Sequence, residues 1–275
     1  MWYKPSPGLR AAGGFRTHPR YRGCVAHWLM DEGGGLTAFD ISGNKNNGTL
    51  TSGPTWTGGQ FGPTLNLDGV DDYVDVGNAS PLQLTGAMTV SAWINLDDLS
   101  ATVHRIVSKF GLAGNRGWEM VLDDAPDNRF TFRISSDGTV TLQAQEAAQW
   151  AFSGQWMHVV GTYEPSTALR IYRNAVLIVE NTTAIPASQF NSSVNARIGR
   201  GPTGGAPFDG KIDDVRIYNR VLSPEEVAWL YNQPFIEFYR ARHVFVSTGA
   251  AAAGQPYLSR FHAVPFVPTY GRSLN

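Results

Sequence analysis

Short runs in which apolar and polar side chains alternate follow one another along the middle of the chain, separated by turn residues. The run MTVSAWINL at 88–96 shows this clearly, because every second residue from Val90 to Leu96 is apolar. A period of two residues is typical of a strand with one face in a core. A spacing of about ten residues without intervening helical patterns indicates antiparallel sheets, arranged as a sandwich or a barrel. The predicted strands are 25–30, 64–67, 72–76, 88–96, 104–110, 117–122, 129–134, 139–145, 155–163, 168–174, 175–181, 196–200 and 211–219.

One short helix is predicted after the last of these strands. Ser223 is followed three residues later by Glu226, with Pro224 at the first helical position, which is the pattern of a capping box. Apolar residues follow at helical spacing, and Pro234 ends the helix. We expect the helix to pack on the edge of the sandwich.

A hairpin is predicted over 168–180, with Asn174 and Ala175 at the centre of its turn. A two-residue turn of this kind prefers glycine second, because that position needs a positive φ. Alanine at 175 therefore predicts a small strain or a longer turn.

The two ends of the chain differ from the middle in charge. Residues 1–23 carry five basic residues and no acidic ones, and residues 235–275 carry four basic residues and one acidic one. The residues between them carry 13 basic and 22 acidic ones. We therefore expect a basic irregular arm at 1–24, a sandwich at 25–233, and an aromatic and basic arm at 234–275.

Composition argues against several classes of protein. Cys24 is the single cysteine of 275 residues, so no internal disulfide can form. No apolar stretch approaches the roughly 18 residues of a membrane-spanning helix, and no secretory signal is visible in the first 24 residues. The basic arm is a modest electrostatic footprint beside an acidic body, so we expect no nucleic-acid partner.

Six segments occur in an order that resembles a known family: VAHWLMDEGGGLTAFDISGNKNNGTLTSGPTW, LNLDGVDDYVDVG, MTVSAWINL, QWMHVVGTY, LRIYRNAVLI and GKIDDVRIYNRVLSPEEVAWLY. Together they resemble the laminin-G-like jelly-roll modules of the concanavalin A-like lectin/glucanase superfamily, over residues 25–233. The resemblance implies an antiparallel two-sheet jelly-roll sandwich. It implies little about function, because this fold serves lectins, adhesion modules, glycosidases and spacers. Ala175 departs from the family, which usually has glycine there.

Catalysis is not indicated. Glucanases of the superfamily carry carboxylates at alternate positions of one strand, and the nearest counterpart here is Glu119-Met-Val-Leu-Asp123, with Val121 in the middle. Four residues of strand span roughly 13 Å, whereas paired glycosidase carboxylates lie roughly 5–9.5 Å apart. The histidines show no metal-ligand spacing. We expect a non-enzymatic protein, and a glycoside hydrolase is the least favoured alternative.

The segment DISGNKNNG at 40–48 alternates oxygen-bearing side chains. It is not an EF-hand, because Thr51 stands where loop position 12 requires glutamate. The resembled modules often hold a structural calcium between an early loop and the last strand, which implies one Ca²⁺ here. The implied ligands are Asp40, Asn44, Asn46, Asp213 and Asp214. The alternative is a turn network, in which these side chains bind nearby backbone and the asparagines adopt left-handed angles.

Glycan binding is a second function that the resemblance implies. Such sites use exposed aromatic rings as stacking platforms, with polar residues at the rim, and the loops 111–117 and 200–209 are expected to form that rim. The predicted glycan-binding residues are Trp56, Tyr73, Trp150, Asn115 and Arg116. For each tryptophan the alternative is a place in the core.

The two arms are expected to dock on another subunit, since arginine and aromatic residues are the usual anchors of interfaces. Similar arms are found on accessory proteins of tailed-phage particles. We therefore expect a homo-oligomeric structural or decoration protein of a virion, docked on a capsid or other particle protein. A carbohydrate-binding adhesion module at an extracellular surface is the alternative. The predicted docking residues are Arg16, Arg20, Arg22, Phe235, Phe238, Tyr239, Arg240 and Arg242. The C-terminal arm could instead fold back on its own sandwich.

Overall fold

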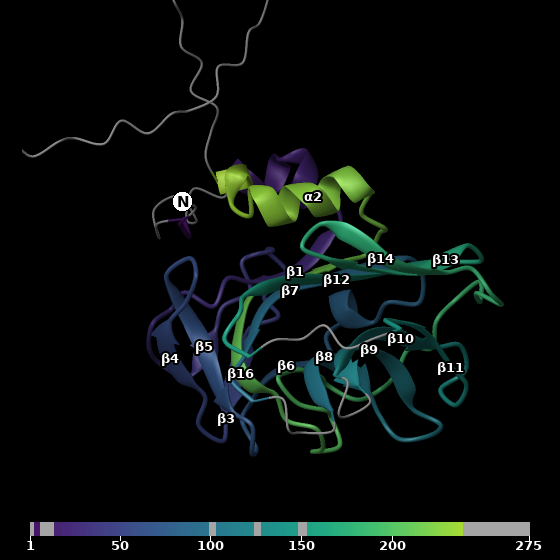
Figure 1. The fold of residues 1–275 in the computed structure, drawn as a ribbon, viewed down its shortest axis with the longest axis horizontal. Helices are drawn as coiled ribbons and strands as arrows, with labels where there is room; N and C mark the ends of the chain where they lie inside the picture. Colours follow the sequence, from purple (N-terminus) through teal and green to yellow (C-terminus); the bar gives the residue numbers. More distant parts are fainter. Residues whose placement is uncertain (1–2, 6–13, 99–102, 124–127, 148–152, 239–275) are drawn as a thin grey trace, which may run out of the picture. The chain divides into compact units, whose positions relative to one another are not determined.

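The computed structural model describes residues 3–5, 14–98, 103–123, 128–147 and 153–238. These residues form sixteen strands in two antiparallel sheets of eight, together with one α-helix. The sheets lie face to face (Figure 1), so the predicted jelly-roll sandwich is confirmed. No helix in this part of the chain is long and apolar enough to cross a membrane.

Sheet A forms one layer of the sandwich and contains eight strands. They are β1 (Cys24–Trp28), β4 (Thr55–Gly58), β5 (Pro63–Asp68), β7 (Met88–Leu96), β12 (Met157–Glu164), β13 (Ala168–Arg173), β14 (Val176–Asn181) and β16 (Asp209–Tyr218). The order is β14-β13-β12-β7-β16-β5-β4, and β1 also pairs with β16. β7 is buried along its full length, because the core covers one of its faces and other parts of the chain cover the other.

Sheet B forms the other layer. Its strands are β2 (Thr37–Ala38), β3 (Gly48–Thr51), β6 (Tyr73–Gly77), β8 (His104–Phe110), β9 (Arg116–Asp123), β10 (Arg129–Ser135), β11 (Thr141–Gln145) and β15 (Ala196–Ile198). They run in the order β11-β10-β9-β8-β15-β6-β3-β2. Along β8 to β11 the side chains that point away from sheet A are largely polar, and we call this surface the open face. It includes Arg105, Glu119, Arg133, Thr141 and Gln143.

Each predicted strand has a counterpart, and three further strands were missed. β2, β3 and β4 contain two to four residues each, rich in threonine and glycine. Such short segments show no apolar alternation, so their pairing partners decide that they are strands.

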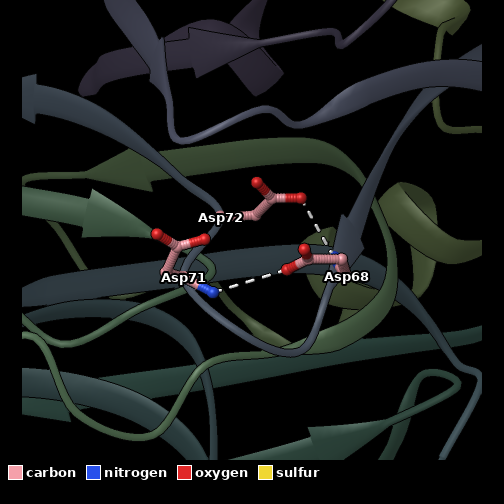
Figure 2. Close-up of side chains that lie close together, drawn as sticks. All are labelled: Asp68, Asp71 and Asp72. Atoms are coloured by element: carbon pink, nitrogen blue, oxygen red, sulfur yellow. Dashed lines mark hydrogen bonds between the residues drawn. The ribbon is translucent and has the colours of Figure 1, made fainter.

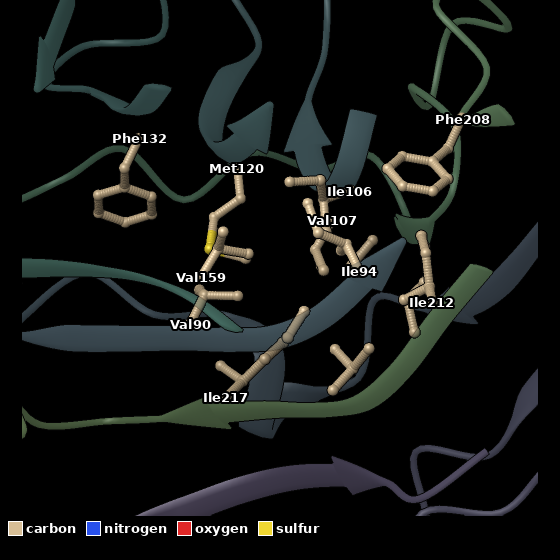
Figure 3. Packing of buried hydrophobic residues seen from close by; sticks show 14 of the residues in the cluster. Val90, Ile94, Ile106, Val107, Met120, Phe132, Val159, Phe208, Ile212 and Ile217 are labelled. Atoms are coloured by element: carbon tan, nitrogen blue, oxygen red, sulfur yellow. The ribbon is translucent and has the colours of Figure 1, made fainter. Parts of the chain in front are cut away.

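One large cluster of buried apolar side chains fills the space between the sheets. In Figure 3, Val90 and Val159 of sheet A lie opposite Met120 and Phe132 of sheet B. Gly161 of β12 permits this packing, because a Cβ there would lie 2.3 Å from Cγ of Phe132. Burying each large apolar side chain stabilises the fold by roughly 1.5–3 kcal/mol, so this core dominates the stability of the sandwich.

The outer face of sheet A is covered by the chain itself, and we call it the covered face. The helix α2 (Pro224–Asn232) lies on it in Figure 1, together with the 3-10 turns η2 (Pro19–Tyr21) and η4 (Ile236–Phe238). Trp93 stacks on Tyr231 with ring centroids 5.5 Å apart and meets Phe61 edge-on at 5.0 Å. The buried residues of this second cluster are Tyr21, Cys24, Leu29, Phe61, Trp93, Val160, Tyr172, Tyr218, Leu222, Val227, Leu230, Phe235 and Phe238.

The predicted helix and its capping box are confirmed. Ser223 Oγ accepts a hydrogen bond from the N–H of Glu226 at 3.3 Å, and Glu226 Oε2 accepts one from the N–H of Ser223 at 3.0 Å. The helix ends at Asn232, two residues before Pro234.

The predicted hairpin turn is tight rather than extended. Asn174 and Ala175 both have positive φ, of 48° and 71°. An L-residue in this region is strained by a clash of its Cβ, so Ala175 carries the strain that the sequence predicts.

Buried charges tie both terminal segments to sheet A. Lys4 Nζ lies 2.5 Å from Asp213 Oδ1. Arg216 donates from Nε and Nη2 to the two oxygens of Asp214, at 3.0 and 3.1 Å, and from Nη1 to Glu237 Oε1 at 2.6 Å. Arg216 is fully buried. Removing one partner from such a network leaves an uncompensated buried charge, so the network holds the segments around Lys4 and Glu237 in place.

The structure corrects part of the docking prediction. Phe235 and Phe238 are 0% and 3% exposed and belong to the covered-face cluster. Their prediction as anchors for another subunit is wrong, because the chain's own sandwich and helix bury them. For residues 234–238 the alternative of folding back on the sandwich therefore holds.

The arginines of the first arm lie at the surface beside α2 and the early loops. Arg20 lies 4.3 Å over the ring of Trp229 and donates to Gln233. Arg16 donates to the carbonyl of Ile41 at 3.1 Å, and Arg16 and Arg22 are exposed. Tyr239, Arg240 and Arg242 lie outside the described residues.

Candidate functional site

A cavity of about 400 Å³ lies on the open face, over β8 to β11. The loop between β8 and β9 forms one side of it, and Thr203 reaches it from the loop between β15 and β16. The lining residues are Arg105, Phe110, Gly111, Leu112, Ala113, Arg116, Arg133, Thr141, Gln143 and Thr203. We call it the β8–β11 cavity.

Two arginines of the cavity are held by one buried carboxylate beneath them. Glu119 of β9 has no exposed side-chain surface. Its Oε1 accepts from Arg133 Nε at 2.6 Å, and its Oε2 accepts from Arg105 Nε at 2.8 Å and Ser108 Oγ at 2.9 Å. Arg133 also donates to Asp123 Oδ2 at 2.8 Å. These charge-assisted bonds fix both guanidinium groups against the sheet.

A third arginine of the cavity forms no ion pair with any carboxylate in the part of the chain that the structure describes. Arg116 donates from Nη1 to the carbonyl of Thr139 at 2.8 Å, and its buried Nε has no hydrogen-bond partner. Its guanidinium lies 5.7 Å from the ring centroid of Phe110, and that of Arg133 lies 5.1 Å from it. Phe110 therefore forms an apolar, electron-rich surface between two cations.

The loop beside the cavity is fixed by backbone bonds. The N–H groups of Gly114 and Arg116 both donate to the carbonyl of Gly138, at 2.8 and 3.0 Å. A side-chain bond adds to these, because Asn115 Oδ1 accepts from the N–H of Ser193 at 2.8 Å. The tip of this loop is Leu112, whose side chain is 72% exposed. An exposed apolar side chain on a braced loop gives the cavity an apolar rim.

The structure places the predicted glycan-binding residues in different environments. Arg116 lines the cavity, whereas the side-chain amide of Asn115 is hydrogen-bonded to Ser193. Trp56 packs against the core and donates to the carbonyl of Gly35. The ring of Tyr73 is covered by Arg197 at 4.3 Å. Trp150 lies outside the described residues.

The loops expected to form the rim do meet at this cavity, because Leu112 and Thr203 both line it. Arg105, Phe110 and Arg133 also line the cavity but were not among the predicted site residues. All three belong to predicted strands, and the alternation along β8 and β10 was the signal that could have placed both arginines on the outer face. Their pairing with Glu119 depends on strand register, which the sequence alone does not determine.

The paired carboxylates on β9 are not arranged for acid–base catalysis. Arg133 bridges Glu119 and Asp123, and both oxygens of Glu119 already accept hydrogen bonds from cationic or hydroxyl donors. A glycosidase needs one carboxyl group free to protonate the glycosidic oxygen. Neither oxygen of Glu119 is available for that role.

The DISGNKNNG segment forms a turn network around Asp40. The carboxylate of Asp40 accepts five hydrogen bonds, from the N–H groups of His27, Ser42 and Asn46 and from the side chains of Ser42 and Asn46. The amides of Asn44 and Asn46 both donate to the carbonyl of Val25. Left-handed angles occur at Gly43 and Lys45 instead of at the asparagines.

The two acids of the last strand have cationic or histidine partners. Asp213 pairs with Lys4, and burial raises its pKa to about 7. Asp214 accepts from His27 Nε2 at 2.7 Å and from Arg216. Burial alone would raise the pKa of Asp214, but Arg216 and His27 hold it below its usual range. As placed, these residues do not fit a calcium shared with Asp40, because cations occupy the positions beside both carboxylates.

A different group of acids lies at the turn between β5 and β6 (Figure 2). Carboxylate oxygens of Asp68, Asp71 and Asp72 lie within 4.8 Å of one another. Asp68 Oδ1 accepts from the N–H groups of Val70 and Asp71, and Asp72 Oδ2 accepts from the N–H of Asp68. These bonds close the turn, so the carboxylates of Asp68 and Asp72 have a structural role there.

The chain belongs to the concanavalin A-like lectin/glucanases superfamily. A laminin-G family model with this description matches residues 68–228, more than half of the chain. The family resemblance of the sequence motifs is therefore confirmed. No curated protein matches the sequence.

Several solved structures have the same fold. The binding domain of Paraclostridial Mosquitocidal Protein 1 aligns with a TM-score of 0.60 at 18% identity, over 77% of this chain and 52% of that one. Domain 4 of AbnA, a GH43 extracellular arabinanase from Geobacillus stearothermophilus in complex with arabinotriose, gives 0.59 at 21% identity, over 76% and 98%. The receptor binding domain of botulinum neurotoxin mosaic serotype C/D gives 0.58 at 15%, over 76% and 50%. This chain thus spans about half of the two toxin domains, and the likeness shows the fold alone.

Proposed function

We propose that the chain is a carbohydrate-binding module whose ligand occupies the β8–β11 cavity. The observation that carries the proposal is the composition of the cavity wall, where hydrogen-bonding side chains stand beside apolar ones. A saccharide presents the same two kinds of surface, with hydroxyl groups around the ring edge and C–H groups on the ring faces. The volume of about 400 Å³ lies within the roughly 300–1,000 Å³ of small-molecule sites.

The donors of the cavity are held by hydrogen bonds within the chain itself. Glu119 holds the guanidinium groups of Arg105 and Arg133, and the carbonyl of Thr139 holds that of Arg116. Ordering a long side chain on binding costs roughly 0.5–1.5 kcal/mol. A site whose arginines are already ordered avoids that cost, which favours a binding role for these residues over a solvated, unused surface.

Two of the similar structures support the proposal. One is an arabinanase domain in complex with arabinotriose, and another is a toxin binding domain. Because function differs within a fold, their support is secondary to the cavity itself. The ion pairs of Glu119 and Asp123 favour binding without turnover, so we propose a non-enzymatic module.

A pair of leucine variants tests the location of the site. Leu112→Ala removes an exposed rim side chain, and Leu177→Ala removes a 45% exposed one from β14 on sheet A. Surface truncations change stability by about 0.5 kcal/mol or less, so both variants fold. On an oligosaccharide array followed by calorimetry, Leu112→Ala weakens binding several-fold and Leu177→Ala leaves it unchanged. Absence of any array ligand for wild type, or an equal effect of both variants, contradicts the proposal.

Assembly into a virion stays a prediction. Its support is the basic and aromatic composition of the two ends, including Tyr239, Arg240 and Arg242. Deleting residues 239–275 leaves the described sandwich complete and removes these residues. If the chain docks by this segment, the full chain associates with a particle or oligomerises and the truncated chain is a monomer. Identical sizes for both in light scattering contradict docking through this segment.

A further inference from the structure

The charges around the β8–β11 cavity are unequal. Three arginines line it, at positions 105, 116 and 133, whereas the carboxylates beside them are Glu119 and Asp123. Glu119 has no exposed side-chain surface, while Arg105 and Arg133 are 18% and 16% exposed. Asp123 is 18% exposed but does not line the cavity, so a ligand in the cavity contacts guanidinium groups rather than carboxylate oxygens.

Arg116 supplies the excess charge. Among the residues that the structure describes, no carboxylate forms an ion pair with it, and its Nε is a donor without an acceptor. The nearby Asp137 is not part of the cavity lining, and its Oδ1 accepts from the N–H groups of Thr139 and Val140 at 2.7 Å. The side chain of Arg116 is partly exposed and has no carboxylate beside it among the described residues, so it is the cation of the cavity that is open to pairing with an anionic ligand.

We propose that the ligand of this cavity is an acidic saccharide, whose ring-borne carboxylate or sulfate group binds Arg116. The inference rests on the proposed carbohydrate-binding function and names its ligand class. Guanidinium and carboxylate or sulfate groups match in charge and in planar spacing of donors and acceptors. Phe110 and Leu112 offer an apolar surface to the ring face. The Thr141 hydroxyl accepts a long bond from Arg116 Nη1 at 3.5 Å and keeps its own proton for a sugar oxygen.

Two features distinguish this site from a neutral-sugar site. A hydroxyl oxygen of a neutral sugar can accept a hydrogen bond from Arg116, but only a carboxylate or sulfate also offers an opposite charge and two oxygens for a bidentate pair with the guanidinium. The negative charge of the rest of the sandwich would also repel an acidic ligand elsewhere, since residues between the two ends carry 22 acidic and 13 basic side chains. Specific binding of an anion therefore has to use a local cluster of arginines.

The test uses the full chain and matched oligosaccharide pairs. Tetragalacturonic acid is compared with its methyl ester, and a sulfated galactan tetrasaccharide with its desulfated form. At least one acidic member binds at least about tenfold more tightly than its neutral counterpart, the factor expected from one charge-assisted hydrogen bond. The pair of oligosaccharides that shows the preference identifies whether carboxylate or sulfate is recognised.

Arg116→Gln removes the charge and keeps a polar side chain, and Arg170→Gln is its control. Arg170 lies on β13 of sheet A, 19% exposed and paired with Glu164 and Glu180. Arg116→Gln abolishes the tenfold preference, and Arg170→Gln retains it, with thermal melts confirming that both variants fold. Equal loss in both variants means nonspecific attraction and overturns the inference.

The outcomes separate this inference from the proposed function. If neutral oligosaccharides of the array bind in the cavity as tightly as acidic ones and Arg116→Gln changes nothing, the inference fails while the carbohydrate-binding function stands. If neither acidic nor neutral oligosaccharides bind, both fail.

Discussion

The two outer faces of the sandwich differ in accessibility: the outer face of sheet A is covered by the chain, and that of sheet B is exposed. On sheet A, Trp93 is 3% exposed beneath α2, and Phe235 packs in the same apolar cluster. On sheet B, Leu112 is 72% exposed and three arginines border a cavity. The covered face is therefore closed by the chain's own terminal segments, and the open face is the one that can receive a ligand.

The difference lies in how each face uses its charges. Arg216 on the covered face is fully buried, and both of its carboxylate partners are buried with it. On the open face, the buried Glu119 holds two arginines that remain partly exposed. Arginine–carboxylate pairs thus hold the C-terminal segment on the covered face, and on the open face they orient guanidinium donors toward solvent.

The largest expected effect comes from breaking the covered face. Arg216→Ala leaves Asp214 and Glu237 buried without their cation, which costs about 3–5 kcal/mol of the free energy of unfolding. Arg170→Ala removes two more exposed pairs and costs about 1 kcal/mol or less. Urea unfolding followed by tryptophan fluorescence measures both. Similar losses for the two variants contradict the role assigned to the buried network.

A pH effect should also originate on the covered face. His158 is buried beside Ser91 and Tyr231, and burial lowers its pKa from 6.5 to about 3. Between these values the unfolded imidazole binds a proton that the folded one does not. The free energy of unfolding therefore falls as pH falls, by about 1.4 kcal/mol per pH unit for this proton.

The variant His158→Gln isolates this contribution. Burial raises the pKa of Asp213 to about 7, so this residue makes the free energy of unfolding rise as pH falls. Its contribution is the same in wild type and in the variant and cancels in the comparison. Comparing urea unfolding at pH 6.5, 5.5 and 4.5, we expect the stability of the variant to fall less steeply than that of wild type. Parallel pH profiles would show that His158 is protonated in the folded protein.

A smaller effect on stability is expected at the turn between β13 and β14, which lies in neither the covered-face cluster nor the β8–β11 cavity. Ala175→Gly relieves the positive φ of 71° but increases the entropy of the unfolded chain, for a net gain of up to about 1 kcal/mol. Ala228→Gly in α2 is the control, and it lowers stability by about 1 kcal/mol. Thermal melts that show a loss for both substitutions would contradict the strain at residue 175.

The smallest effect is expected from chelation. Asp40 is saturated by five hydrogen bonds, and Asp213 and Asp214 face Lys4 and Arg216. We therefore expect the melting midpoint to be the same with EDTA and with added calcium. A midpoint that falls with EDTA and returns with calcium would restore the predicted calcium and show that the ion replaces part of this network.

Sequence reasoning succeeded where a pattern is local. The alternation of 88–96 predicted β7 with its observed bounds, and the capping box at Ser223 predicted the start of α2. It failed where neighbours decide the structure. The Thr- and Gly-rich β3 is a strand because β2 and β6 flank it, and Phe235 is buried because α2 and Phe61 receive it.

In the candidate site, too, one residue could be predicted from local sequence and others only from the arrangement of the strands. Arg116 was predicted because the sequence places it in the expected rim loop 111–117, and as the first residue of β9 it does line the cavity. Arg105 and Arg133 acquire their role from register, since Arg133 lies opposite Glu119 across β9 and β10. That pairing joins strands whose alignment depends on the whole sheet.

Hydrogen exchange with and without ligand tests the central claim most directly. The full chain is labelled alone and with the oligosaccharide that binds most tightly in the array. The account predicts slower exchange in 105–116, 131–143 and the segment around Thr203, with no change in 89–93 or α2. Protection of α2 and the covered face, with the β8–β11 cavity unaffected, would contradict it.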